Sequence, residues 1–334
     1  MAPVIEINGL SKVYVRDVIG FENGRLRVRL KDRRTVALKP LDLTVEEGEI
    51  FGLLGPNGAG KTTAIKILMG LHFPTSGDAR IMGRPLEDNS VKAKIGFLPE
   101  NPFFYDYLKG EEFLDYYGQL YGMDKASRRR RIPELLETVG LSHAAQLPLR
   151  GYSKGMLQRA GLAQALLNDP KVVFLDEPQS GLDPFGRKEV RDLILSLREQ
   201  GKTVFFSSHI LQDAEMICDR VAILHQGERI AVGALSEMLS AKVKEYEVGF
   251  SDVPKEIVEK TKKGAARFVE RPNEYLAVFD KEDEARAAVR AILDANGMLE
   301  SFIARKETLE EYFIREIEGK REAERAALAN GGKS

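Results

Sequence analysis

The stretch GPNGAGKT, from Gly55 to Thr62, limits the possible folds of this chain more than any other feature. It follows EIFGLL, which predicts a buried strand, and precedes a predicted helix from Lys61 to about Gly70. A glycine-rich loop in this context closes its backbone N–H groups on phosphates, while lysine and hydroxyl side chains meet phosphate oxygens and Mg²⁺. We therefore expect a nucleotide-phosphate site formed by Gly55, Pro56, Asn57, Gly58, Ala59, Gly60, Lys61, Thr62 and Thr63.

The segment VVFLDEP, residues 172–178, is the second motif with clear chemistry. Its apolar residues place Asp176 at the carboxyl end of a buried strand, where ligands of α/β sheets bind. Asp176 is a candidate for holding Mg²⁺ through its water shell, together with Thr62. Glu177 is in position to orient or deprotonate an attacking water. Two carboxylates at a strand end are weak evidence alone, but the phosphate loop strengthens the interpretation.

The order of predicted elements indicates an α/β fold. Strands at 172–176, 203–208 and 220–225 alternate with helices at about 185–200 and 210–217. This alternation is typical of a parallel sheet covered by helices. Residues 106–168 are mostly helical by pattern. Near the N-terminus, Glu22-Asn23-Gly24 followed by the alternating RLRVRL predicts an extra β-hairpin at about 15–36.

The pattern changes after about residue 240. Alternating segments and two helical stretches follow the order βαββαβ, which predicts a small ferredoxin-like α+β domain over 240–318. An amphipathic helix closes this domain, and a charged, alanine-rich tail covers 319–334. No catalytic cluster is visible in this domain, so dimerisation, regulation and plain stabilisation stay open as its role.

Composition narrows the possible partners and compartment. Lys and Arg total 50 against 51 Asp and Glu, a balance that gives no general attraction to nucleic acid. Cys218 is the single cysteine, so no internal disulfide forms and a reduced cytosol is the expected setting. No secretory signal and no apolar run of about 20 residues is present. We expect any membrane role to come through a partner.

A second candidate anion site lies at GYSKGMLQRAG, residues 151–161. Ser153 and the open backbone at Gly155 begin a predicted helix that runs to about Leu167. The exposed N–H groups and positive dipole of a helix start favour anions. The question is why a chain with a complete phosphate loop has a second such feature.

Together these motifs resemble the nucleotide-binding subunit of an ATP-binding cassette (ABC) transporter, over residues 4–235. Ser153-Lys154-Gly155 matches the family's signature segment, Ser180-Gly181-Leu182-Asp183 its D-loop, and His209 its switch histidine. The five elements occur in the order and spacing of the family. This agreement is far more specific than a lone phosphate loop.

The resemblance implies an ABC ATPase domain over 1–236, with a parallel-sheet core, an antiparallel β subdomain and a helical subdomain at about 101–168. It implies ATP and Mg²⁺ as cofactors, and Tyr14 as the aromatic that stacks on adenine. His209 would contact the γ-phosphate, although an ordinary capping role is its alternative. In a head-to-tail dimer, Ser153, Gly155 and Asp183 would meet the nucleotide of a second copy, which answers the question of the second anion site.

Several positions depart from the common family pattern. LPEN places Glu100, instead of glutamine, where the family offers a ligand to nucleotide-bound Mg²⁺. Tyr152 and Lys154 replace a usual leucine and glycine, and Gln179 replaces a common threonine. LPEN and YSKGM resemble the bacterial exporter branch with separate membrane subunits. That branch implies transmembrane permease subunits as partners and the cytoplasmic face of the cell membrane as the location. Whether Lys154 contacts a partner's nucleotide or solvent stays open.

Two other functions compete with transport. A soluble ABC ATPase acting on ribosomes or DNA would carry two cassettes or a long coiled coil, and neither pattern occurs here. A simple P-loop kinase or GTPase leaves the signature segment and His209 unexplained.

Two surface features complete the expectations. The resemblance implies that Phe103–Tyr107 line a docking groove for the membrane subunit. The SRRRR run at 127–131 is expected to be a solvated helix face, with contact with anionic lipid as its alternative.

Overall fold

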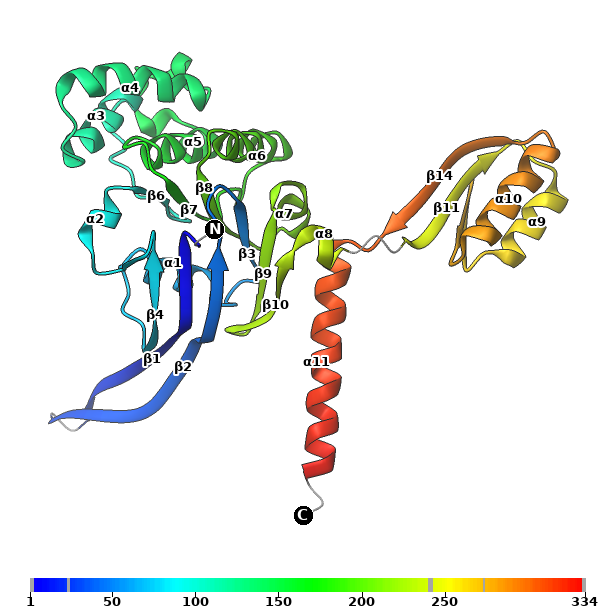
Figure 1. Ribbon diagram of the computed structural model, residues 1–334, viewed down its shortest axis with the longest axis horizontal. Coiled ribbons are helices and arrows are strands. Elements are labelled where there is room, and N and C mark those ends of the chain that lie inside the picture. Colours follow the sequence, from blue (N-terminus) through cyan, green and yellow to red (C-terminus); the bar gives the residue numbers. More distant parts are fainter. Residues whose placement is uncertain (1–2, 23–24, 240–242, 273, 332–334) are drawn as a thin grey trace. The chain divides into compact units, whose positions relative to one another are not determined.

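The computed structural model describes residues 3–22, 25–239, 243–272 and 274–331. The chain forms two compact units, Met1–Leu235 and Ser236–Ser334. Figure 1 labels the helices and strands of both units. The α/β fold class predicted from the sequence is confirmed, and each unit is described by itself below.

A six-stranded sheet forms the centre of the first unit (Figure 1). Its order is β10 (Glu228–Ala234), β9 (Arg220–His225), β3 (Ile50–Leu54), β8 (Thr203–Ser208), β7 (Val172–Asp176) and β6 (Ile95–Leu98). All neighbours are parallel except the antiparallel pair of β10 and β9. Strands β3, β7 and β8 are buried at every position, as their continuous apolar runs predict.

A second, antiparallel sheet has the order β2 (Arg25–Val45), β1 (Ile5–Glu22), β4 (Ser76–Ile81) and β5 (Arg84–Pro85). Helix α1 (Lys61–Leu68) contacts both β2 and β7. One apolar core therefore joins the helix to both sheets; its buried members include Ile5, Ile7, Leu43, Phe51, Ile65, Leu68, Phe174 and Phe205. This packing fixes the position of the glycine-rich loop, which lies between β3 and α1.

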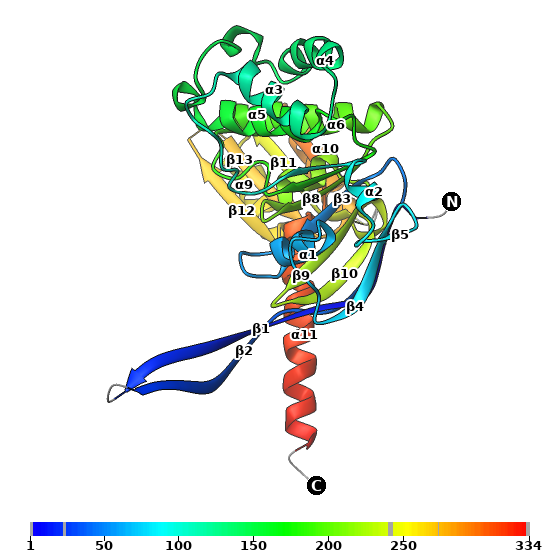
Figure 2. The same ribbon diagram turned by 90° about the vertical axis from the view of Figure 1, so that its left-hand side faces the viewer.

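The predicted hairpin at 15–36 is part of longer strands. Strands β1 and β2 pair continuously from Ile5 opposite Val45 to Glu22 opposite Arg25, with several register shifts. Figure 2 shows this two-stranded ribbon extending beyond the other strands of its sheet. The hairpin predicted at about 15–36 is therefore confirmed, and it is the outer part of two longer strands of the antiparallel sheet.

The helical part of the first unit follows β6. It contains α3 (Gly110–Leu120), α4 (Lys125–Thr138), two short 3₁₀ turns at Ser142–Ala144 and Leu149–Gly151, and α5 (Lys154–Ala165). The short α2 (Asn89–Lys92) precedes β6, while α6 (Pro184–Glu199) and α7 (Leu211–Ile217) follow β7 and β8. Helices α6 and α7 both contact β3.

The arginine run at 127–131 is only half solvated. Arg128 donates to Asp115 at 2.7 Å and to the Met123 carbonyl at 2.6 Å. Arg131 donates to the Leu166 carbonyl at 3.2 Å, whereas Arg129 and Arg130 are exposed. The prediction of a solvated face is wrong for two of the four arginines, because they connect α3, α4 and α5.

The second unit has the βαββαβ order expected from its sequence. Its elements are β11 (Val243–Ser251), α9 (Lys255–Gly264), β12 (Arg267–Arg271), β13 (Glu274–Phe279), α10 (Glu282–Asp294) and β14 (Met298–Lys306), with the short α8 (Leu235–Met238) before them. The sheet order is β12-β13-β11-β14, and all pairs are antiparallel. A core of Val248, Phe250, Ala277, Phe279, Ala285 and Ile292 joins the sheet to its helices.

The last helix is longer than its sequence pattern indicates. Helix α11 covers Leu309–Gly331 and includes most of the predicted charged tail, whose alanine-rich sequence has high helix propensity. Residues 332–334 of the predicted tail lie outside the described residues. Among the helices that the structure describes, none is both long and apolar enough to cross a membrane.

Candidate active site

The glycine-rich loop borders a cleft of about 380 Å³ at the carboxyl ends of the parallel strands. Gly60 caps the start of α1, and a methyl group there would lie 2.5 Å from the Ala37 carbonyl, so only glycine fits. The lining combines the loop with two carboxylates and a strand of the other sheet: Thr35, Val36, Ala37, Asn57, Gly58, Ala59, Gly60, Lys61, Thr62, Thr63, Glu100 and Glu177.

Lys61 is buried and makes three polar contacts within the site. Its Nζ donates to the carbonyl oxygens of Gly55 at 2.7 Å and Pro56 at 3.1 Å. It also forms an ion pair with Glu177 Oε1 at 3.0 Å, and both side chains are only 5–6% exposed. An ammonium group has three N–H donors; two of them bond these carbonyl oxygens, and the contact with Glu177 is electrostatic.

Asp176 accepts two hydroxyl hydrogen bonds at the end of β7. Thr62 Oγ1 donates to its Oδ1 at 3.1 Å and Ser207 Oγ donates at 2.6 Å. Burial raises the pKa of Asp176, and the hydrogen bonds from Ser207 and Thr62 oppose that shift. Ser207 is missing from the sequence prediction. Its parallel register opposite Asp176, at the polar end of an apolar strand, is the signal that identifies it.

Glu177 connects the phosphate loop to the end of β8. Its carboxylate Oε2 lies 2.7 Å from His209 Nδ1 and also accepts from the His209 backbone N–H at 3.3 Å. Because a carboxylate only accepts, the proton of this contact belongs to His209 Nδ1. Glu177 has a φ of 50°, which is strained for a residue with a side chain, and its N–H donates to Ser207 Oγ at 2.9 Å.

The donor set of the cleft suits a magnesium ion that arrives with phosphates. Among the described residues, no group of three or more His, Cys, Asp or Glu side chains could hold a metal. The Thr62 hydroxyl and the Asp176 carboxylate do lie together, and exposed Glu100 lines the same cleft. Magnesium commonly takes one or two protein oxygens together with substrate phosphates, so these residues fit the ion.

Tyr14 lies beside His72, and it is not part of the cleft lining. Its hydroxyl is 3.3 Å from His72 Nδ1, and the two rings meet edge to face at 5.9 Å between centroids. Thr35, its register partner on β2, does line the cleft. The lining segment 35–37 is missing from the sequence prediction, because only the pairing of two distant strands brings it beside the loop.

Ser153, Gly155 and Asp183 lie at helix starts and are also not part of this cleft lining. The Ser153 hydroxyl accepts from the Met156 N–H at 3.3 Å at the start of α5. Asp183 caps α6 by accepting from the Gly186 N–H at 2.7 Å. Within one chain, the structure therefore brings together Lys61, Thr62, Glu100, Asp176, Glu177 and His209, but not the signature segment.

The aromatic side chains after Glu100 divide into exposed ones and one that packs inside the helical part. Phe103 is 84% exposed and Tyr107 is 66% exposed. Phe104 instead packs against buried Phe113, with 5.0 Å between ring centroids. Of the predicted groove Phe103–Tyr107, Phe104 therefore belongs to the core of the helical part, since its ring faces α3.

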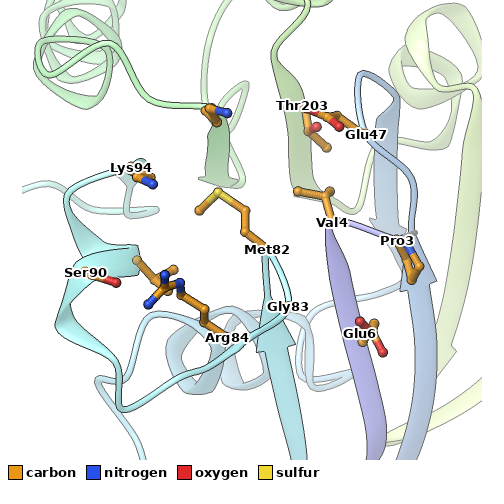
Figure 3. A pocket seen from close by; sticks show the side chains of 12 residues that line it. Pro3, Val4, Glu6, Glu47, Met82, Gly83, Arg84, Ser90, Lys94 and Thr203 are labelled. Carbon is orange, nitrogen blue, oxygen red and sulfur yellow. The ribbon is translucent and has the colours of Figure 1, made fainter. Parts of the chain in front are cut away.

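A second pocket, of about 390 Å³, lies at the opposite ends of the parallel strands (Figure 3). Its lining includes Glu47, Lys94 and Thr203, at the amino ends of β3, β6 and β8. None of the motif residues lines it. Ligands of α/β sheets bind at the carboxyl ends of strands, so the cleft beside Lys61 is the better candidate.

Known proteins share these features. A family model described as ABC transporter matches residues 38–180. An ABC transporter ATP-binding protein of Synechocystis sp. is 47% identical over 95% of this chain and 85% of its own. The Nod factor export ATP-binding protein I of Cupriavidus pinatubonensis is 35% identical over 65% of this chain and 67% of its own.

A solved structure gives the same result. It is a dimeric ATP-binding cassette in a post-hydrolysis state, bound to ADP and Pi, with a TM-score of 0.59 and 27% identity. The similarity covers 69% of this chain and 98% of that chain. The phosphate loop and the carboxylates of the cleft lie within this fold. Since 47% identity to the Synechocystis relative extends along almost the whole chain, this protein belongs to the ABC transporter ATP-binding proteins and is an ATP hydrolase.

Proposed function

We propose that this chain hydrolyses ATP as a head-to-tail dimer and drives export through separate transmembrane subunits at the cytoplasmic face of the membrane. The observation that carries this proposal is the buried contact of Glu177 with both Lys61 and His209 beside the phosphate loop. Lys61 and Glu177 line the cleft, and Glu177 links them to His209, so a cation, a carboxylate and a histidine are joined by direct contacts.

In this proposal, ATP binding replaces the contacts of Lys61. The phosphate oxygens bind the Lys61 ammonium and the backbone N–H groups at the start of α1, while Tyr14 stacks on adenine. Thr62, Asp176 and Glu100 would hold Mg²⁺, which would neutralise phosphate charge when bound. Released from Lys61, Glu177 accepts the proton of the attacking water, and His209 keeps that water in line with the γ-phosphate.

The signature segment completes the site of a second copy. Ser153 and Asp183 are exposed, and a methyl group at Gly155 would have nothing closer than 3.9 Å, so this backbone is accessible. The relative whose structure is a dimeric cassette supports this arrangement. Each nucleotide would lie between the phosphate loop of one chain and Ser153, Gly155 and Asp183 of the other.

A mixing experiment tests the composite site. Lys61→Met disables the phosphate loop and Ser153→Arg disables the signature segment, so each variant alone is expected to have almost no activity. In a head-to-tail dimer, a mixed pair has one intact site, so an equal mixture recovers about a quarter of normal turnover. Phosphate release measures this recovery. No recovery in a mixture that does form heterodimers would contradict the head-to-tail arrangement.

Export and the membrane partner are supported by the Nod factor export relative and by the exposed aromatic residues Phe103 and Tyr107. We expect Phe103→Ala to lose stimulation of ATP hydrolysis by the membrane subunits, while basal hydrolysis stays unchanged. Phe73→Ala is the matched control, because Phe73 is 82% exposed after α1. Equal stimulation of both variants, measured after co-purification from the native membrane, would contradict this docking surface.

We further propose that the second domain, about 240–318, supports dimerisation. It forms its own core, separate from that of the ATPase domain over 1–236. Deleting the residues after 240 is expected to weaken the ATP-dependent dimer and leave nucleotide affinity unchanged. Sedimentation with and without ATP measures the dimer. A dimer that assembles at the same ATP concentration as the full chain would assign this domain another role.

A further inference from the structure

Lys154 occupies an electrostatically unfavourable position. It is the first residue of α5, where the helix dipole is positive and a cation is unfavourable. Among the described residues, no acidic side chain forms an ion pair with Lys154. The neighbouring helix start at α4 also has a lysine, Lys125, but it follows the acidic cap Asp124. Another contact must therefore account for the position of the Lys154 side chain.

The Lys154 ammonium lies over the loop between β7 and α6. A methyl group placed on Gly181 would overlap Lys154 Nζ and lie 3.0 Å from its Cε. Gly181 has a φ of 67°, which favours glycine independently of this contact. Beside it, the Leu182 side chain lies 3.9 Å from where a methyl group on Gly155 would be. The start of α5 thus contacts this loop at two adjacent points.

The loop under Lys154 is hydrogen-bonded to Glu177 itself. The Ser180 N–H donates to the Glu177 carbonyl at 3.0 Å, and the Leu182 N–H donates to the Gln179 carbonyl at 3.3 Å. Glu177 has strained backbone angles, so its orientation depends on these neighbours. A short path of contacts therefore connects Lys154, through Gly181 and Ser180, to the backbone carbonyl of Glu177 in the same chain.

We propose that Lys154 is a positioning residue that couples the start of α5 to Glu177. When Ser153 engages the nucleotide of the partner, Lys154 transmits the movement of α5 to the loop 180–182 and so to the Glu177 of its own site. Nucleotide binding at one ATP site of a dimer would thereby affect the position of Glu177 at the other site. This inference rests on the proposed head-to-tail dimer and on the proposed role of Glu177.

Steady-state kinetics of Lys154→Met test the coupling, because this change removes the charge and keeps the chain length. We expect kcat to fall about tenfold with KM changed less than twofold, since a small misplacement of Glu177 affects the chemical step. Lys154→Arg should restore most of kcat. Lys125→Met is the matched control at a helix start, and its kcat should equal that of the unmodified protein.

A double-variant cycle tests the contact with Gly181 directly. Gly181→Ala should reduce kcat more in the presence of Lys154 than in Lys154→Gly, where the space above residue 181 is free. An equal reduction in both backgrounds would overturn the contact. A normal kcat in Lys154→Met would overturn the coupling.

A direct contact of Lys154 with the partner's nucleotide predicts a different result. In the Glu177→Gln background, Lys154→Met would then raise the ATP concentration needed for dimerisation several-fold, and that result would also overturn the proposed coupling. Failure of the proposed function gives a different result from failure of the coupling. If Glu177 is not the base, the single variant Glu177→Gln hydrolyses ATP normally.

Discussion

Glu177→Gln is expected to slow ATP hydrolysis by about 10²–10⁴-fold, the usual contribution of a general base. The amide cannot take the proton of the attacking water, although it keeps the size and the hydrogen bond of Glu177 with His209. Phosphate release at saturating ATP measures the loss. Glu199→Gln, an exposed position at the end of α6, is the matched control and should hydrolyse ATP normally.

The same variant should bind ATP at least as tightly as the unmodified chain. Its amide forms no ion pair with Lys61, so the ammonium is easier to transfer to the phosphates. Because hydrolysis no longer dissociates the complex, the variant should accumulate as a dimer when ATP is added, and sedimentation measures this dimer. Normal turnover would assign the base to another residue, and weakened ATP binding would show that the Lys61–Glu177 pair does not compete with nucleotide.

Lys61→Met is expected to remove measurable ATP binding and to destabilise the nucleotide-free first unit. The variant loses the cation that meets the phosphates and leaves the carboxylate of Glu177 buried without its ion-pair partner. Removing one partner of a buried pair destabilises a protein by about 3–5 kcal/mol. Titration with a fluorescent nucleotide measures the binding, and thermal unfolding measures the stability.

Two controls separate these effects of Lys61→Met. Adding Glu177→Gln should recover part of the lost stability but none of the ATP binding, because the buried charge is then absent. Lys188→Met removes an exposed lysine that pairs with Asp192 on α6, and such a pair contributes only about 0–1 kcal/mol. A Lys61→Met chain as stable as the Lys188→Met chain would contradict the importance of the buried pair.

Local motifs predicted which residues the structure brings together at the centre of the candidate site. The glycine-rich loop and VVFLDE each combine a strand end with a few polar residues, so short stretches of sequence specify both their geometry and their chemistry. The structure brings Lys61, Thr62 and Glu100 to one cleft, with Asp176 hydrogen-bonded to Thr62 and His209 to Glu177. Parallel strands explain this grouping, since their carboxyl ends meet at one edge.

Features that depend on distant pairing were harder to predict. Ser207 and the segment 35–37 reach the site only through sheet register, which the sequence does not encode locally. The orientation of Phe104 depends on contacts with α3, so a run of aromatics did not separate inward from outward rings. Helix α11 extends beyond its amphipathic segment, because alanine-rich sequence favours a helix without requiring an apolar face.

The buried pair of Lys61 and Glu177 makes nucleotide binding an exchange of anions. The Glu177 carboxylate pairs with the Lys61 ammonium where a phosphate oxygen would otherwise bind, so the cleft does not present an uncompensated buried cation. Inorganic anions of the cell must displace the chain's own carboxylate before they can bind there. A nucleotide overcomes this competition through the additional contacts of its phosphates, and the site is thus selective before any second copy arrives.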